Sequence, residues 1–148
     1  MLKAISIFIL SCCLIACSST KSDSQAPTLN YIDLTGDKII EAGDEYWTVV
    51  KRSVPRYPRE AAIQGLNGCV NIIIGINADG KMQGYKIQSS YPKRVFDNVA
   101  AAALAQWQWK ATKKNISLQP ILTSIRLDFS VDGSSYNAKY EKNCPSSV

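Results

Sequence analysis

The sequence contains no histidine among its 148 residues. Histidine is the commonest general base and metal ligand in proteins, so its absence argues against a catalytic triad and most metal sites. No Gly-x-Ser-x-Gly elbow occurs, and no acidic cluster has the spacing of a metal site. Lysine and tyrosine can act as bases, but nothing in their spacing favours that role. We therefore predict that the protein is not an enzyme and holds no metal, cofactor or small-molecule substrate.

A strong charge of one sign is also lacking. The chain has 17 Lys and Arg residues against 12 Asp and Glu residues, which gives a formal net charge of +5. No stretch gathers the dense block of basic residues that nucleic-acid-binding proteins present. We therefore predict that nucleic acid is not a partner.

The chain begins with an apolar run that is too short to cross a membrane. Lys3 precedes residues 4–16, which carry no charge, whereas a membrane-spanning helix needs about 20 apolar residues. A basic residue before a short apolar run is typical of a secretory signal peptide. We assign the signal peptide to residues 1–16.

The end of this run, Leu14-Ile15-Ala16-Cys17, resembles the lipobox of bacterial lipoproteins. The resemblance implies cleavage before Cys17 and acylation of this cysteine, palmitate included. Several acyl chains hold a small protein firmly on a membrane. An ordinary signal peptide with a chance cysteine is the alternative. By analogy with lipoprotein sorting, Ser18 in the next position indicates the outer membrane, on the periplasmic side, of a Gram-negative bacterium.

The five cysteines stand at positions 12, 13, 17, 69 and 144. The first two leave with the signal peptide and the third is lipidated, so two remain for the folded domain. An exported protein matures in an oxidising compartment, where cysteines pair. We predict a disulfide between Cys69 and Cys144, with two separate thiols as the alternative.

Removal of residues 1–16 from the 148 leaves 132 residues, a length that suits one domain with a short tether. Residues 18–28 are small and polar and cannot bury apolar area, which predicts a disordered tether. Residues 29–44 carry mixed signals and suggest irregular structure. We therefore expect the lipidated cysteine and a flexible tether over residues 17–44, followed by a single domain over residues 45–148.

The first half of this domain predicts strands and one short helix. Residues 46–52 are aromatic and β-branched, which indicates an extended strand that could lie at a sheet edge. A proline at helix position N1 predicts a helix over residues 58–64. Alternating apolar residues on either side of Asp79-Gly80 predict a β-hairpin within residues 69–90.

The second half predicts a helix and a last strand. Apolar residues recur at helical spacing from Phe96 to Trp107, which indicates a helix of about three turns. Strict alternation over residues 124–131 predicts a third strand. We therefore expect a small two-layer α+β domain. Its antiparallel three-stranded sheet, with or without an N-terminal edge strand, packs against two helices.

Short motifs follow one another along residues 54–131 at the spacing of a known family. They are Tyr57-Pro58, Gly68-x-Val70, Asp79-Gly80, Ser89-Ser90, Phe96-Asp97 and Trp107-x-Trp109. In this order they resemble the C-terminal domain of the TonB family of energy transducers. Each motif alone also fits an ordinary place in a core or a turn, so the order identifies the fold and the fold suggests the function.

The resemblance implies a binding function. In the TonB family the third strand of the sheet takes up an N-terminal peptide of outer-membrane TonB-dependent transport receptors by strand addition. By position, the partner-binding residues here are Ser124, Ile125, Arg126, Leu127, Asp128, Phe129 and Ser130. The outward side chains of Ser124, Arg126 and Asp128 would select among peptides, and an ordinary solvated face is the alternative. We therefore expect a TonB-like periplasmic peptide-binding module on a lipoprotein.

Two further considerations keep a second function open. Family transducers carry a membrane-spanning helix and a long proline-rich rod, whereas we expect a lipid anchor and a tether of at most about 40 Å. The binding edge would be blocked if residues 46–52 or the tail with Cys144 covered it. The alternative is a non-transducing structural or adaptor lipoprotein of an envelope assembly complex, with contacts through Tyr46, Trp47 and Tyr140.

Overall fold

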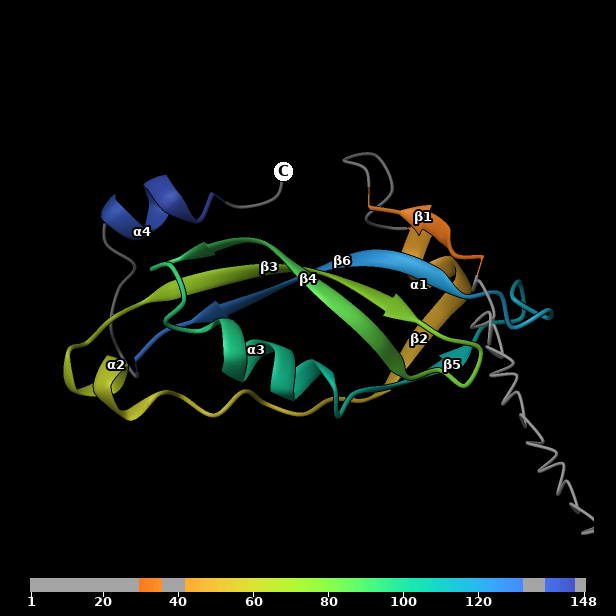
Figure 1. The fold of residues 1–148 in the computed structure, drawn as a ribbon, viewed down its shortest axis with the longest axis horizontal. Coiled ribbons are helices and arrows are strands. Elements are labelled where there is room, and N and C mark those ends of the chain that lie inside the picture. Colours follow the sequence, from red (N-terminus) through yellow and green to blue (C-terminus); the bar gives the residue numbers. More distant parts are fainter. Residues whose placement is uncertain (1–29, 36–41, 132–137, 146–148) are drawn as a thin grey trace, which may run out of the picture.

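The computed structural model describes residues 30–35, 42–131 and 138–145. The predicted signal peptide, Cys17 and the tether up to residue 29 lie outside the described residues. The described residues form six strands and four short helices (Figure 1). The predicted α+β class is confirmed.

The main sheet has four strands in the order β1-β6-β3-β4. Strands β3 (Gly68–Ile76), β4 (Met82–Tyr91) and β6 (Ile121–Phe129) form the antiparallel core of this sheet. Strand β1 (Ile32–Leu34) pairs in parallel with the first three residues of β6. The predicted three-stranded antiparallel sheet is therefore present, with a short N-terminal strand added at one edge.

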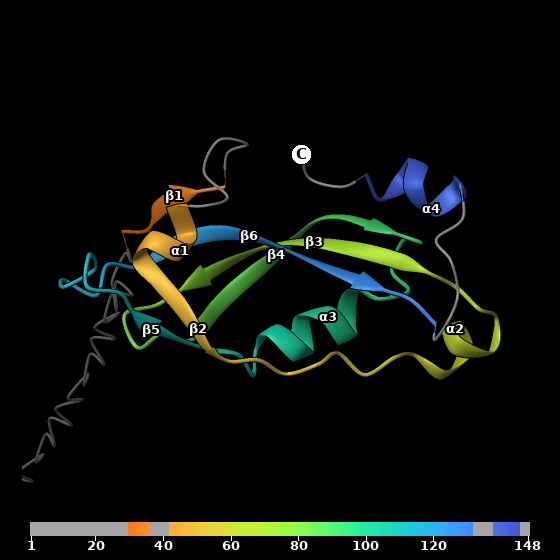
Figure 2. The same cartoon turned by 180° about the vertical axis from the view of Figure 1, so that it is seen from behind.

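One face of the sheet is apolar because alternate residues of β3 point toward it. Val70, Ile72, Ile74 and Ile76 are almost fully buried on this face. Helices α2 (Arg59–Ile63) and α3 (Asp97–Leu104) lie on this side, whereas α4 (Ala138–Asn143) lies on the other (Figures 1 and 2). We call the two sides the inner face and the outer face of the sheet.

An aromatic cluster closes the end of the core where β6 ends. The rings of Phe96 and Phe129 stack with centroids 4.3 Å apart, and Tyr57 meets Phe96 edge-on at 5.4 Å. Gly68 lies directly against this cluster, because a Cβ atom there would be 2.5 Å from the Phe96 ring and 2.1 Å from the carbonyl oxygen of Tyr91. Three of the sequence motifs, at Tyr57, Gly68 and Phe96, thus meet in one packed unit.

A second, two-stranded sheet lies at the other end of the molecule. Strand β2 (Trp47–Lys51), which follows directly on α1 (Ala42–Tyr46), pairs antiparallel with β5 (Gln108–Ala111). The β3–β4 turn contacts this sheet, because Trp109 donates its main-chain N–H to the Gly80 carbonyl at 2.9 Å. Gly80 has a φ of +67° and leaves no room for a side chain, since a Cβ would lie 2.0 Å from the Trp109 carbonyl oxygen.

Three sequence-based expectations need correction. The helix predicted from Phe96 to Trp107 ends at Leu104, and residues 108–111 form β5 instead. The segment 46–52 contains a strand, as predicted, but β2 pairs with β5 and not with the edge of the main sheet. Within the range 17–44, predicted as a tether, the structure has β1 and the first residues of α1.

Candidate functional site

The candidate site is the stretch of β6 that β1 leaves uncovered. The N–H of Ile32 donates to the Pro120 carbonyl at 3.0 Å, so the main chain of Pro120 faces β1. The β3–β6 register runs without a bulge from residue 121 to residue 129. Because main-chain groups of alternate residues point to the same side of a strand, those of Ser124, Arg126 and Asp128 face the same edge as Pro120.

This edge is open over its second half. Strand β1 pairs with residues 121–123, and this parallel register directs the Ser124 N–H to the Leu34 carbonyl. Beyond that bond, from the Ser124 carbonyl to Asp128, no described residue pairs with the edge-facing main-chain groups. An unpaired strand edge offers a row of N–H and C=O groups to an incoming strand. We call this stretch, residues 124–128, the open edge.

The seven residues predicted to bind a partner divide into three groups. Ser124, Arg126 and Asp128 carry their side chains on the outer face, opposite Ile73, Asn71 and Cys69 of β3. Ile125 and Leu127 point to the inner face and are only half-buried. The Phe129 side chain is 4% exposed and belongs to the core, and Ser130 lies just beyond the end of β6.

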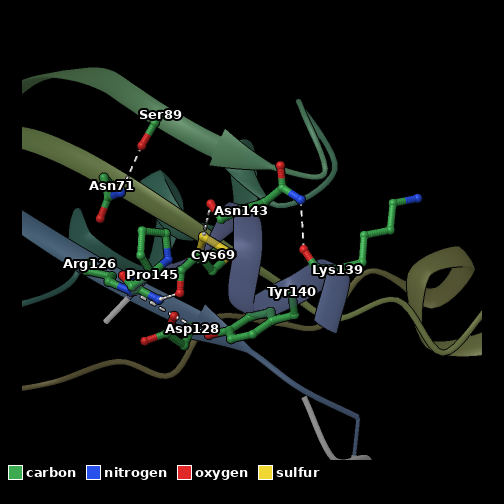
Figure 3. Close-up of a disulfide and its surroundings, with 10 residues drawn as sticks. Cys69, Asn71, Ser89, Arg126, Asp128, Lys139, Tyr140, Asn143 and Pro145 are labelled. Carbon is green, nitrogen blue, oxygen red and sulfur yellow. Dashed lines mark hydrogen bonds and ion pairs between the residues drawn. A yellow bond between two sulfur atoms is a disulfide. The ribbon is translucent and has the colours of Figure 1, made fainter. Parts of the chain in front are cut away.

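The C-terminal segment, residues 138–145, covers part of the outer face beside the open edge. Cys144 forms a disulfide with Cys69 of β3, and the two Cα atoms are 5.9 Å apart. With Tyr140 the pair makes a small buried cluster. This segment contacts side chains of the open edge and makes no strand pairing with it (Figure 3).

Arg126 and Asp128 are held by that segment. The Arg126 guanidinium donates to the carbonyl of Cys144 at 2.8 Å and to that of Pro145, and it forms an ion pair with Asp128 at 2.9 Å (Figure 3). The Tyr140 hydroxyl donates to Asp128 at 2.7 Å. Partial burial alone would lower the pKa of Arg126, but the hydrogen bonds to Asp128 and Tyr140 outweigh it and raise the pKa above its ordinary value.

A groove of about 380 Å³ runs on the inner face beside the open edge. One wall is β6, with Ile125 and Leu127. The opposite wall is aromatic and apolar, and its residues are Trp47, Val49, Trp107 and Trp109. These include all three tryptophans of the chain. We call this feature the inner groove.

Charges mark the ends of the β2 wall of the inner groove. Asp44 precedes β2 and Arg52 follows it, and both line the groove. The Arg52 guanidinium lies 5.2 Å from the centroid of the Trp107 ring, and no described carboxylate pairs with it. Sequence reasoning missed this groove because it is formed by segments about 75 residues apart in the chain, which only the tertiary fold brings together.

The contact residues proposed for the alternative scaffold function are mostly not available. Trp47 is 3% exposed and Tyr140 is 6% exposed, and Tyr46 is half-buried. That expectation was therefore wrong for Trp47 and Tyr140, because each packs in its own apolar cluster.

Two negative observations apply to the described part of the chain. No group of three or more Cys, Asp or Glu residues there is arranged to hold a metal ion. No helix among residues 30–35, 42–131 and 138–145 has the length and apolar character needed to cross a membrane.

Comparison with known proteins identifies relatives of this chain. Residues 53–131, just over half of the chain, match the family model described as Gram-negative bacterial TonB protein C-terminal. The chain is 34% identical over 56 residues to Protein TonB of Pseudomonas aeruginosa, a match that covers 38% of this chain and 16% of the relative. It is 28% identical over 69 residues to Protein TonB of Klebsiella aerogenes, covering 47% of this chain and 28% of the relative. The match thus spans less than a third of the length of each of these curated relatives.

A solved structure agrees with the fold. The solution NMR structure of the Pseudomonas aeruginosa TonB CTD superposes with a TM-score of 0.51 at 23% identity, covering 60% of this chain and 90% of that chain. The family-model match confirms the resemblance inferred from the order of the sequence motifs. The chain belongs to the family of Gram-negative bacterial TonB protein C-terminal domains.

Proposed function

We propose that this protein is a periplasmic binding module that takes up an extended peptide of an outer-membrane TonB-dependent transport receptor by strand addition. The peptide pairs with the open edge of β6 and extends the main sheet by one strand. Main-chain hydrogen bonds supply affinity in this mode, and side-chain pockets supply specificity.

The open edge is the observation that carries this proposal. The Ser124 carbonyl and the main-chain groups of Arg126 and Asp128 are unpaired there, in the part of the chain that the structure describes. The hairpin, α3 and β6 fall within the family-matched segment, so the edge is a feature of the domain that the relatives share. Membership of the TonB family supports an envelope location and an outer-membrane receptor as the partner.

The lipid anchor is a second part of the proposal. Cys17 is acylated and holds the domain on the periplasmic face of the outer membrane. The support is the lipobox-like sequence that ends at Cys17, with Ser18 after it. Radiolabelled palmitate is expected to enter the protein in a Gram-negative host, and a Cys17→Ser variant is expected to take up none. Label in that variant would contradict the assignment.

A proline at Arg126 tests strand addition. The Arg126 N–H faces the open edge beyond β1, so its loss leaves the β3–β6 and β1–β6 ladders intact. Arg126→Ala is the matched control, because it loses the same side-chain contacts to Asp128, Cys144 and Pro145 but keeps the N–H. The assay is isothermal titration of the full chain with peptides from the N-terminal region of TonB-dependent receptors.

We expect Arg126→Pro to bind the peptide about tenfold or more weakly than Arg126→Ala does. The expected loss is that of one main-chain hydrogen bond together with a steric block to pairing. Arg126→Ala should bind the peptide measurably, because its main-chain groups are intact. Equal affinity of the proline variant and the alanine variant would show that the peptide does not add to β6.

A further inference from the structure

Strand addition to the family-matched segment does not by itself account for the inner groove. The wall opposite β6 is formed partly by β2, which precedes the matched segment, residues 53–131. Trp47 and Val49 of this wall therefore add a recognition surface outside the matched segment. The groove runs along the inner-face side of the open edge. A strand bound at that edge therefore determines which side chains enter the groove.

A strand added to β6 would place half of its side chains beside this groove. Successive side chains of a strand point to opposite faces of a sheet. One set of the peptide's side chains therefore faces the inner side, next to Ile125 and Leu127, and the other set faces the outer side, next to Arg126. Directly opposite and diagonal neighbours on one face lie close enough to pack together.

The two faces offer different chemistry to these two sets. On the outer side, Arg126 is already bonded to Asp128 and to two carbonyls of the C-terminal segment. On the inner side, the half-buried Ile125 and Leu127 face an aromatic and apolar wall across a space of about 380 Å³. Arg52, which no described carboxylate neutralises, adds a positive charge at one end of that wall.

We propose that the inner groove selects the peptide: it receives bulky apolar side chains from alternate positions of the added strand, with an acidic residue of the peptide at Arg52. This inference rests on the proposed strand addition and specifies which peptide sequences the site prefers. The ligand class is an extended peptide that alternates apolar with polar residues and carries a carboxylate at one end. Receptor peptides that lack the alternation should bind poorly, even where their main chain can pair.

Designed peptides test the alternation directly. One nine-residue probe carries leucine at positions 3, 5 and 7, threonine at positions 2, 4, 6 and 8, and glutamate at positions 1 and 9. A second probe has the same composition with its leucines consecutive, and a third has alanine in place of each leucine. Because all three tryptophans of the chain line the groove, entry of a leucine should change their fluorescence, and none of the probes contains tryptophan.

Two neighbouring residues of β2 give a matched pair of protein variants. Val49 lines the groove, whereas Val50 is 59% exposed and does not. Val49→Lys should fill the groove with a charged side chain and weaken binding of the alternating probe by about tenfold or more, since the probe then loses the burial of an aliphatic side chain. Val50→Lys should leave the affinity unchanged. Circular dichroism checks that both variants fold.

The charge requirement has its own pair of variants. Arg52→Gln should reduce the preference for the glutamate-ended probe over a glutamine-ended one, whereas Arg56→Gln, an exposed arginine outside the groove, should not. The measurement is the ratio of the two dissociation constants in low salt. An unchanged ratio for Arg52→Gln would overturn the assignment of the carboxylate to this residue.

The outcomes separate this inference from the function on which it rests. Tight binding of the alternating probe, weak binding of the other two and a fluorescence change would support it. Equal binding of all three probes, lost in Arg126→Pro but kept in Val49→Lys, would overturn the groove's role and leave strand addition standing. Binding of none of the probes, together with no binding of receptor peptides, would overturn both.

Discussion

The disulfide is expected to be a large contributor to the stability of the domain. It joins residues 75 positions apart, Cys69 on β3 and Cys144 after α4. In the loop-entropy description, a cross-link that closes a loop of this length removes about 15 cal/mol/K from the unfolded chain, which is about 4.5 kcal/mol at 25 °C. Reduction should therefore lower the free energy of unfolding by several kcal/mol.

The loss has an upper and a lower bound with physical causes. The full 4.5 kcal/mol or so applies if the C-terminal segment stays docked after reduction. If Tyr140 and the carbonyl contacts to Arg126 do not hold the segment, it leaves the sheet, and the released chain entropy offsets part of the loss. We therefore expect a decrease of about 2 to 4.5 kcal/mol.

The assay is urea unfolding of the full chain, followed by circular dichroism and tryptophan fluorescence. The oxidised protein is compared with the protein in reductant, and a Cys69→Ala/Cys144→Ala variant serves as the control for effects of the reductant. With a slope of about 1 to 3 kcal/mol per molar urea, the midpoint should fall by at least roughly 0.7 M. A change below about 0.5 kcal/mol, in reductant and in the double variant, would refute the reasoning.

Three further predictions concern the core, a turn and one carboxylate. Phe96→Ala should destabilise the domain by about 3 to 5 kcal/mol, because it empties the stack on Phe129; the readout is the urea midpoint, and a loss under about 1 kcal/mol would contradict that packing. Gly80→Ala should cost about 2 kcal/mol or more, since its φ is +67° and the new Cβ would meet the Trp109 carbonyl; unchanged thermal stability would contradict this. The Asp33 carboxylate accepts hydrogen bonds from a neighbouring threonine, which lowers its pKa, so an NMR titration should place its inflection below the ordinary value. The stabilisation from these bonds is therefore present above the unfolded pKa and is lost as the pH falls through the lowered one.

The parts of the fold that the sequence predicts are those set by local patterns. Strands β3 and β6 alternate apolar and polar residues, and the Asp79-Gly80 turn between β3 and β4 has its own chemistry, so the hairpin and the third strand could be placed. The disulfide followed from the cysteine count. The open edge at residues 124–128 falls inside the range expected from the family resemblance, and its role in binding stays a prediction.

The parts that were missed depend on contacts between distant segments. The helical spacing of apolar residues continues beyond α3 to Trp107 and predicts a longer helix. The chain instead leaves the helix at Ala105, and residues 108–111 pair as β5 with β2. Trp107 and Trp109 remain buried in the core after that change. Strand β1 has only three residues and exists through pairing with β6, so no local pattern could reveal it.

The inner groove illustrates the same limit at the site. Its walls come from β2 and β6, and neither sequence indicates that the other lies across from it. Arg52 and Val49 carry no motif, and their importance comes from their position beside an edge that is 75 residues further along the chain. One sequence feature could have suggested this region. All the tryptophans of the chain, at positions 47, 107 and 109, lie on the segments that form the groove, and aromatic side chains are enriched at binding surfaces.

The most direct test of the account is amide hydrogen exchange by NMR on the full chain, with and without a receptor peptide. Strand addition at β6 predicts that the amides of Arg126 and Asp128 exchange readily in the free protein and become protected when the peptide binds. Strand β4, at the opposite edge of the main sheet, should keep its exchange rates. Protection of β4 amides, or binding that leaves the Arg126 and Asp128 amides unprotected, would contradict the central claim.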